Sequence, residues 1–132
     1  MSIIESDTQM ESESKKGKNA ITHWRVLQCF EFATLLACRL ETGRTHQIRV
    51  HLTSIGHSVV GDQQYGKSPF KRLSCISAEL SQTITNFRRQ ALHAELLGFI
   101  HPSSGEWLEF KAQFPDDFQN LLIEMQRAEA KL

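Results

Sequence analysis

Hydrophobic and polar residues alternate along two neighbouring segments in the first third of the chain, residues 20–28 and 33–42. In the second segment Leu36, Cys38 and Leu40 share one face, and the charged residues Arg39 and Glu41 fall on the other. This alternation is typical of β-strands, in which every second side chain points to the same side. We therefore expect two strands that pair as neighbours.

A second pair of alternating segments, residues 92–100 and 106–112, lies near the end of the chain. The five residues between them, 101–105, read His-Pro-Ser-Ser-Gly. Proline, serine and glycine favour turns because of their fixed or permissive backbone angles and their local hydrogen bonds. The pattern predicts a β-hairpin with its loop at residues 101–105.

Helical spacing is present at residues 45–55, where Ile48, Leu52 and Ile55 recur at intervals of four and three. Thr45 is a suitable N-cap, and Gly56 follows where a helix would stop. We expect the apolar side of this helix to face the sheet.

Two further helices are predicted, at residues 76–87 and after Pro115, whose ring suits the first turn of a helix. Acidic residues follow Pro115 directly, where the helix dipole stabilises negative charge. Together the elements predict an α+β fold, with a mostly antiparallel sheet and packed helices. The last helix has one apolar side, formed by Phe118, Leu121, Leu122 and Met125.

The first 18 residues differ from the rest, because they are rich in serine, glutamate and lysine and have no hydrophobic period. Such a segment buries too little apolar surface to offset the entropy lost on ordering. We expect residues 1–18 to be a disordered leader, and residues 19–132 to form one domain.

Composition excludes several classes of protein. The chain has 132 residues, of which 40% are hydrophobic and 23% charged, and no apolar stretch long enough to span a bilayer. No secretory signal pattern is present, so a cytoplasmic location is expected. The three cysteines have no Cys-x-x-Cys spacing, which favours reduced thiols over a disulfide framework or a zinc site.

The formal net charge is zero, but the charges are unevenly distributed. Residues 39–72 carry six basic and two acidic side chains, a local charge of plus four, whereas the first 14 residues are acidic. A local basic stripe attracts the phosphates of nucleic acid even on a neutral protein, although solvated charged surfaces are common. The basic residues of this stripe are Arg39, Arg44, Arg49, Lys67, Lys71 and Arg72.

The candidate chemistry lies at residues 43–51, Gly-Arg-Thr-His-Gln-Ile-Arg-Val-His. A strand that turns through Gly43 into a helix presents backbone N–H donors where the helix dipole favours anions. Arg44 and Arg49 extend this site, because the planar guanidinium pairs with a carboxylate or phosphate through two hydrogen bonds.

The sequence does not support three other kinds of site: a zinc site, a serine nucleophile and a nucleotide-binding loop. His46 and His51 are five residues apart, so they do not share a helix face as a zinc-binding pair would. No Gly-x-Ser-x-Gly nucleophile motif occurs. Residues 61–68 match the phosphate-loop pattern Gly-x4-Gly-Lys-Ser, but Pro69 follows and no helical period continues, so we do not interpret them as a nucleotide site.

The run from Leu40 to Gly66 resembles the third motif and following Gly-Asp-x-x-Tyr-Gly loop of the RluA-type pseudouridine synthases. Further matches, at residues 20–27 and 89–102, extend the resemblance to about residues 20–122. The resemblance implies that residues 19–132 are the C-terminal half of a catalytic domain that isomerises uridine in ribosomal or transfer RNA, without metal or cofactor. It also implies that Arg49 pairs with the catalytic aspartate.

The same resemblance implies further site residues. Arg44, Thr45, His46 and Gln47 would form the wall of the site, Tyr65 would pack near it, and Leu92 would lie near the reacting base. Independently of the resemblance, Lys67, Lys71 and Arg72 of the basic stripe are expected to contact RNA phosphates.

The family's catalytic aspartate lies in a His-Arg-Leu-Asp segment, which these 132 residues do not contain. Asp62 is expected in a turn and is a poor substitute. The chain is therefore expected to be inactive alone and to be completed by a separate N-terminal half, for which the half sheet should leave an unpaired strand edge. The alternative is a non-catalytic RNA-binding module.

Overall fold

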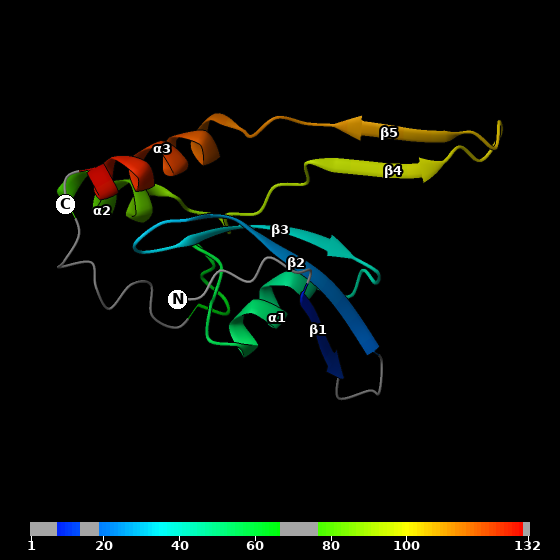
Figure 1. Ribbon diagram of the computed structural model, residues 1–132, viewed down its shortest axis with the longest axis horizontal. Helices are drawn as coiled ribbons and strands as arrows, with labels where there is room; N and C mark the ends of the chain where they lie inside the picture. The colour runs from blue at the N-terminus through cyan, green and yellow to red at the C-terminus, as the bar shows by residue number, and fades with distance from the viewer. Residues whose placement is uncertain (1–7, 14–18, 67–76, 131–132) are drawn as a thin grey trace.

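The computed structural model describes residues 8–13, 19–66 and 77–130 and shows an α+β fold with antiparallel sheets, as predicted (Figure 1). Within these ranges, eight elements form a three-stranded sheet, a separate hairpin and three helices. Among the described residues, no helix is both long and apolar enough to cross a membrane. In chain order the elements are β1 Thr8–Glu13, β2 Asn19–Cys29, β3 Thr34–Leu40, α1 Gln47–Ser54, α2 Ala78–Asn86, β4 Leu96–Ile100, β5 Trp107–Lys111 and α3 Asp116–Ala130.

The first sheet has the order β1-β2-β3 and is antiparallel throughout. The pairing of β2 with β3 confirms the two predicted neighbouring strands, with Thr22 opposite Leu40 and Val26 opposite Leu36. The register shifts between Val26 and Gln28, as at a β-bulge.

Strand β1 corrects the expectation that all of residues 1–18 are disordered. Its six residues pair with β2, from Thr8 opposite Trp24 to Glu13 opposite Asn19. The sequence gives no sign of this strand because a strand at the edge of a sheet is held mainly by backbone hydrogen bonds to its neighbour. The remaining residues of the expected leader lie outside the described part of the chain.

Helix α1 begins and packs differently from the prediction. The N-cap is His46 rather than Thr45, and Ile55, expected on the buried side, is 47% exposed. The buried side chains of α1 are instead Gln47, Arg49, His51 and Leu52. A mostly polar face of the helix therefore lies against the rest of the protein, beside β2.

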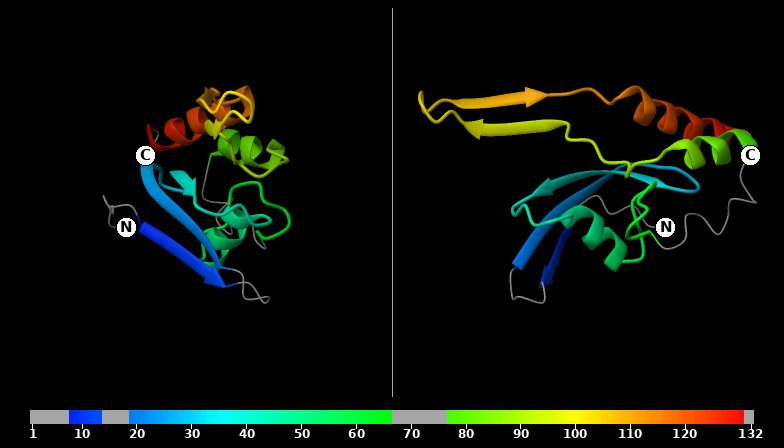
Figure 2. Two further views of the ribbon diagram at one scale, coloured as in Figure 1. Left: turned by 90° about the vertical axis from the view of Figure 1, so that its right-hand side faces the viewer. Right: turned by 180° about the vertical axis from the view of Figure 1, so that it is seen from behind.

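The hydrophobic core lies between α2, α3 and the turn that joins β2 to β3 (Figures 1 and 2). Ser77 caps α2, and its hydroxyl oxygen accepts a hydrogen bond from the backbone of Leu80. The predicted apolar side of α3 is confirmed, because three of its four residues are buried and Leu122 packs beside them. The buried cluster consists of Phe30, Leu80, Ile84, Phe87, Phe118, Leu121 and Met125.

The loop after α1 is fastened to this core at Gly61. The N–H of Ala91 donates to the carbonyl of Val60 over 2.7 Å, and Gly61 lies directly against the carbonyl of Arg89. Gly61 has a φ of +81°, which favours glycine, and any Cβ there would strike that carbonyl. This contact fixes the loop against the segment that follows α2, and so fixes the position of Asp62 in that loop.

Strands β4 and β5 form the predicted hairpin, which extends away from the helices and the first sheet (Figures 1 and 2). Strand β4 begins at Leu96 rather than at residue 92. The segment before it is held by a side chain instead of a strand partner, because Arg89 Nη1 donates to the carbonyl of Leu92 over 3.2 Å.

Candidate functional site

The centre of the candidate site is a buried ion pair between Arg49 of α1 and Asp62 of the following loop. Arg49 Nε lies 2.9 Å from Asp62 Oδ2, and Arg49 Nη2 lies 2.7 Å from Asp62 Oδ1. The side chains are 9% and 0% exposed. The sequence prediction gave Arg49 a partner outside the chain, whereas the structure pairs it with a residue 13 positions later.

Asp62 accepts four hydrogen bonds, because its Oδ1 also accepts the backbone N–H groups of Gln64 and Tyr65, each over 3.1 Å. The hydrogen bond from Arg49 is the main cause that lowers the pKa of Asp62 to about 2, against the opposing effect of burial. Asp62 also caps the turn that follows it, as expected of a turn residue. A carboxylate engaged in this way is fixed and ionised, and is a poor nucleophile.

Arg49 retains donors that Asp62 does not use. A guanidinium has five N–H groups. Two bind Asp62 and a third, on Nη2, donates to Gln64 Oε1 over 3.3 Å. Among the described residues nothing accepts a hydrogen bond from Nη1, so this end of Arg49 can receive a further acceptor.

An aromatic pair lies beside the guanidinium. Arg49 Cζ lies 4.9 Å from the centre of the Tyr65 ring, and the Tyr65 hydroxyl lies 2.9 Å from Nδ1 of His46. His46 has a φ of 52°, a left-handed conformation that non-glycine residues seldom adopt. Backbone strain of this kind is often found at functional sites. The structure thus brings together Arg49, Tyr65 and His46, three of the predicted site residues.

Arg44 and Thr45 lie on the exposed turn before α1. Arg39, at the end of β3, is also exposed. These arginines belong to the predicted basic stripe, but Arg49 does not contribute to it, because its charge is buried and neutralised by Asp62. Lys67, Lys71 and Arg72, and the basic loop predicted around them, lie outside the described residues.

Gln47 has a different role from the predicted one. Its Nε2 donates to the carbonyl of Ile21 and to the hydroxyl of Thr22, and its Oε1 accepts from Thr42 and from the backbone of Arg44. At 5% exposure, it joins the start of α1 to β2 instead of lining an open wall. Thr22 and His51 complete this buried network, with 2.7 Å between the Thr22 hydroxyl and His51 Nδ1.

Thr22 was not predicted as a site residue, and His51 was considered from the sequence only as a zinc ligand. The signal that could have found the network is the four-residue spacing of Gln47 and His51, which places two polar side chains on one helix face.

Burial of His51 predicts a pH effect on stability. Desolvation lowers the pKa of His51 below its ordinary value of 6.5, so the folded protein keeps this imidazole neutral where the unfolded chain protonates it. Stability should therefore fall as the pH decreases below about 6.5. Urea unfolding at pH 7.5 and 5.5 should show a larger loss for the native sequence than for a His51→Asn variant; equal losses would contradict this role.

Leu92 is half-buried, before β4 and outside any strand. Its carbonyl accepts from Arg89, whose guanidinium forms an exposed ion pair with Asp117. The structure does not show a contact between Leu92 and Arg49, Tyr65 or His46.

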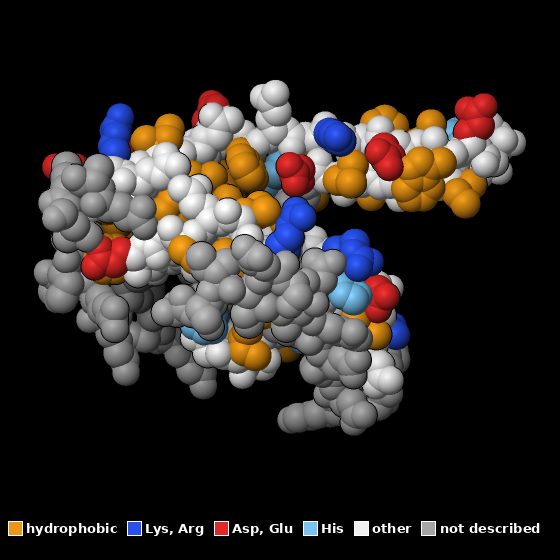
Figure 3. Space-filling model, in the orientation of Figure 1, with side chains coloured by type: hydrophobic (Ala, Val, Ile, Leu, Met, Phe, Trp, Pro, Cys, Tyr) orange, Lys and Arg blue, Asp and Glu red, His pale blue; other side chains and the backbone are white. Residues whose placement is uncertain are grey.

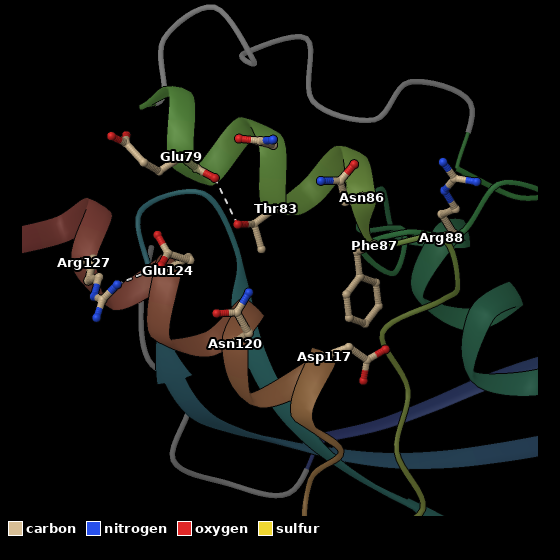
Figure 4. A pocket seen from close by; sticks show the side chains of 10 residues that line it. Glu79, Thr83, Asn86, Phe87, Arg88, Asp117, Asn120, Glu124 and Arg127 are labelled. Carbon is tan, nitrogen blue, oxygen red and sulfur yellow. Dashed lines mark hydrogen bonds and ion pairs between the residues drawn. The ribbon is translucent and has the colours of Figure 1, made fainter.

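A shallow groove between α2 and α3 is separate from this site (Figure 4). Glu79, Asn86 and Asn120 are among the polar side chains that line it, and the ion pair between Arg127 and Glu124 lies at one end. None of the motif residues at 43–66 lines the groove, and we assign it no part in the chemistry.

The sequence model of the RNA pseudouridylate synthase family matches residues 2–54. A protein named ribosomal large subunit pseudouridine synthase D, from Zymomonas mobilis subsp. mobilis, is 51% identical over 110 residues, which are 83% of this chain and 32% of that protein. The protein of the same name from Pasteurella multocida is 48% identical over 116 residues, 88% of this chain and 35% of that protein. The chain thus spans about a third of the length of these relatives.

Two solved structures share the fold. Human RNA pseudouridylate synthase domain containing 4 has a TM-score of 0.66 and 22% identity, over 92% of this chain and 56% of the other. Human RNA pseudouridylate synthase domain containing 1 has a TM-score of 0.59 and 28% identity, over 91% and 53%. In both structures, the part of the chain outside the match is nearly as long as the matched part.

Proposed function

The chain belongs to the RluA-type family of pseudouridine synthases, and from this we propose that it supplies one part of an active site that isomerises uridine to pseudouridine in RNA. The observation that carries the proposal is the Arg49 guanidinium, which is held rigidly by Asp62 and whose Nη1 has no acceptor among the described residues. An arginine fixed in this way can orient a second carboxylate at little further entropic cost.

The catalytic aspartate is proposed to come from outside these 132 residues. The His-Arg-Leu-Asp segment of the family is not in the sequence, and Asp62 is already bound by four donors. We propose that a further polypeptide part, the N-terminal half of the domain, brings the aspartate to Arg49. Without that part the chain is expected to have no activity.

The reaction exchanges one bond of uracil for another. The bond between ribose C1′ and uracil N1 breaks, the base turns, and a new bond joins C1′ to C5. The proton on C5 is lost and N1 gains one, so atoms and charge balance without metal or cofactor. The role of Arg49 is to hold the incoming aspartate ionised, because a neighbouring positive charge lowers a carboxyl pKa.

The proposed substrate is RNA, and the names of the relatives favour ribosomal RNA of the large subunit. Arg39 and Arg44 are exposed, Arg44 on the turn that leads into α1, and we expect them to bind phosphates on either side of a uridine turned out of its stack. Lys67, Lys71 and Arg72 are proposed to extend this contact. A cytoplasmic location follows from this substrate and stays a prediction.

Tritium release tests the proposed function. The chain should be incubated with large-subunit ribosomal RNA made in vitro with tritium at uridine C5, since forming the new bond liberates that tritium. We expect no release above a blank from the chain alone, and release after a polypeptide with the His-Arg-Leu-Asp segment is added. Release by the chain alone would refute the missing nucleophile. RNA binding without release from either sample would favour the non-catalytic RNA-binding module.

A further inference from the structure

One face of the β4–β5 hairpin is entirely apolar. In the observed register Leu97 pairs with Phe110 and Phe99 pairs with Leu108. These four residues, which we call the apolar face, point to the same side because side chains alternate along each strand. Leu97 is 59% exposed and Phe110 55% exposed, and the rings of Phe99 and Phe110 stack with centres 5.8 Å apart.

The opposite face is mixed, because it exposes Leu96, Ile100 and Trp107 but also carries the charged residues Glu109 and Lys111. The Trp107 ring lies across Gly98, and its Nε1 donates to Glu109 over 2.9 Å. Lys111 also lies on this side, opposite Leu96. A sheet with one mixed polar face and one apolar face is typical of a sheet that is solvated on one side and packed on the other.

The hairpin also offers unpaired backbone groups. Hydrogen-bonded pairs alternate along an antiparallel ladder, and His101 with Glu106 and Ala112 with Glu95 are such pairs. Leu96, Gly98 and Ile100 therefore direct their N–H and C=O groups to the outer side of β4. Within the described part of the chain β4 and β5 pair only with each other.

Among the described residues, no other element covers this hairpin. It extends beyond the helices and the three-stranded sheet, and hydrophobic side chains are visible along it (Figures 1 and 3). A two-stranded hairpin is at best marginally stable alone in water, so an apolar face in this position needs a partner.

We propose that the apolar face and the outer edge of β4 form the docking surface for the N-terminal half that carries the aspartate. This inference rests on the proposed function. Two solved structures of the same fold continue into nearly as much chain again, and the relatives are about three times as long as the matched region. An added strand on β4 would satisfy the edge, and the layer behind it would cover the apolar face.

A second copy of this chain fits the surface less well. The four side chains expose on the order of 400 Å², whereas a stable dimer needs about 800 Å² from each partner. The apolar face alone is therefore too small for a dimer interface, but it is sufficient as one part of a continued sheet.

The test compares glutamate substitutions on the two faces of the hairpin. Leu97→Glu and Phe110→Glu alter the apolar face, whereas Lys111→Glu places the same charge on an exposed residue of the mixed face in β5, away from the outer edge of β4. The probe is the polypeptide with the His-Arg-Leu-Asp segment, and its Kd is measured by calorimetry without RNA. We expect a Kd at least about 30-fold weaker for Leu97→Glu and Phe110→Glu, because a charge is buried at a packed contact, and about the native Kd for Lys111→Glu.

Circular dichroism and Tm of each free variant serve as controls, and should be unchanged because these side chains are exposed in the chain alone. Equal Kd values for all three variants would overturn the proposal. So would dimers of the chain alone that Phe110→Glu dissociates. Face-dependent binding without tritium release would support the docking surface and refute the enzymatic function. Tritium release that the face variants do not reduce would support the enzymatic function and refute the docking surface.

Discussion

Replacement of Asp62 by alanine is expected to lower the free energy of unfolding by about 3 kcal/mol or more. The carboxylate is completely buried and accepts four hydrogen bonds, so its loss leaves a buried positive charge without its partner. The loop would also lose the cap of its turn. Urea unfolding at pH 7, with a linear fit of the free energy, measures the effect.

A matched control exists in the ion pair of Asp117 with Arg89, which has the same two-bond geometry but side chains 48% and 41% exposed. Asp117→Ala should destabilise the chain far less, because solvent screens an exposed pair. Equal losses for Asp62→Ala and Asp117→Ala would show that burial of the first pair has no special role.

The ion pair between Arg49 and Asp62 also predicts how the stability of the protein changes in acid. The folded pKa of Asp62 is about 2, below its ordinary value of 3.8. Its contribution is therefore fully present above pH 4 or so and is lost as the pH falls towards 2. The difference between the native sequence and Asp62→Asn should shrink over this range, well below the range in which His51 acts.

The second large effect is expected for Arg49→Lys in the completed enzyme. We expect roughly 100-fold slower tritium release, because lysine keeps the charge but cannot bind Asp62 in two hydrogen bonds and orient a second carboxylate together. The assay should be run with saturating N-terminal half, at a temperature where circular dichroism shows the variant folded.

A purely structural role for Arg49 would lower the rate without changing its pH profile. A positioning role should move the acid limb of the profile to higher pH, because the incoming aspartate loses part of the interaction that lowers its pKa. Arg44→Lys is the control, and we expect it to weaken RNA binding modestly and to leave the profile unchanged. An unshifted profile for Arg49→Lys would contradict the proposed role.

The sequence predicted the parts of the fold that depend on local pattern. The pairing of β2 with β3, the hairpin around residues 101–105 and the apolar side of α3 are confirmed, because each leaves a period of two or about 3.6 in neighbouring residues. The position of β1 could not be predicted, since its pairing with β2 depends on backbone groups that every sequence has.

The site was predicted less completely, for a physical reason. The arginine of the motif was found by resemblance, but its partner Asp62 lies beyond two turns and is brought close by the contact of Gly61 with Arg89. The buried face of α1 was predicted from Ile48, Leu52 and Ile55, of which only Leu52 is buried, whereas Gln47 and His51 are buried through hydrogen bonds to Thr22. Polar residues satisfied by distant partners leave no hydrophobic period.

The most direct test of the central claim concerns which polypeptide owns the nucleophile. The N-terminal half should be prepared with the aspartate of its His-Arg-Leu-Asp segment replaced by alanine, mixed with the native chain, and assayed for tritium release beside the unaltered half. The account predicts that the complex still forms and that release falls to the level of the blank. Persistent release would mean that the nucleophile lies within this chain, and would contradict the assignment of Asp62 as the fixed partner of Arg49.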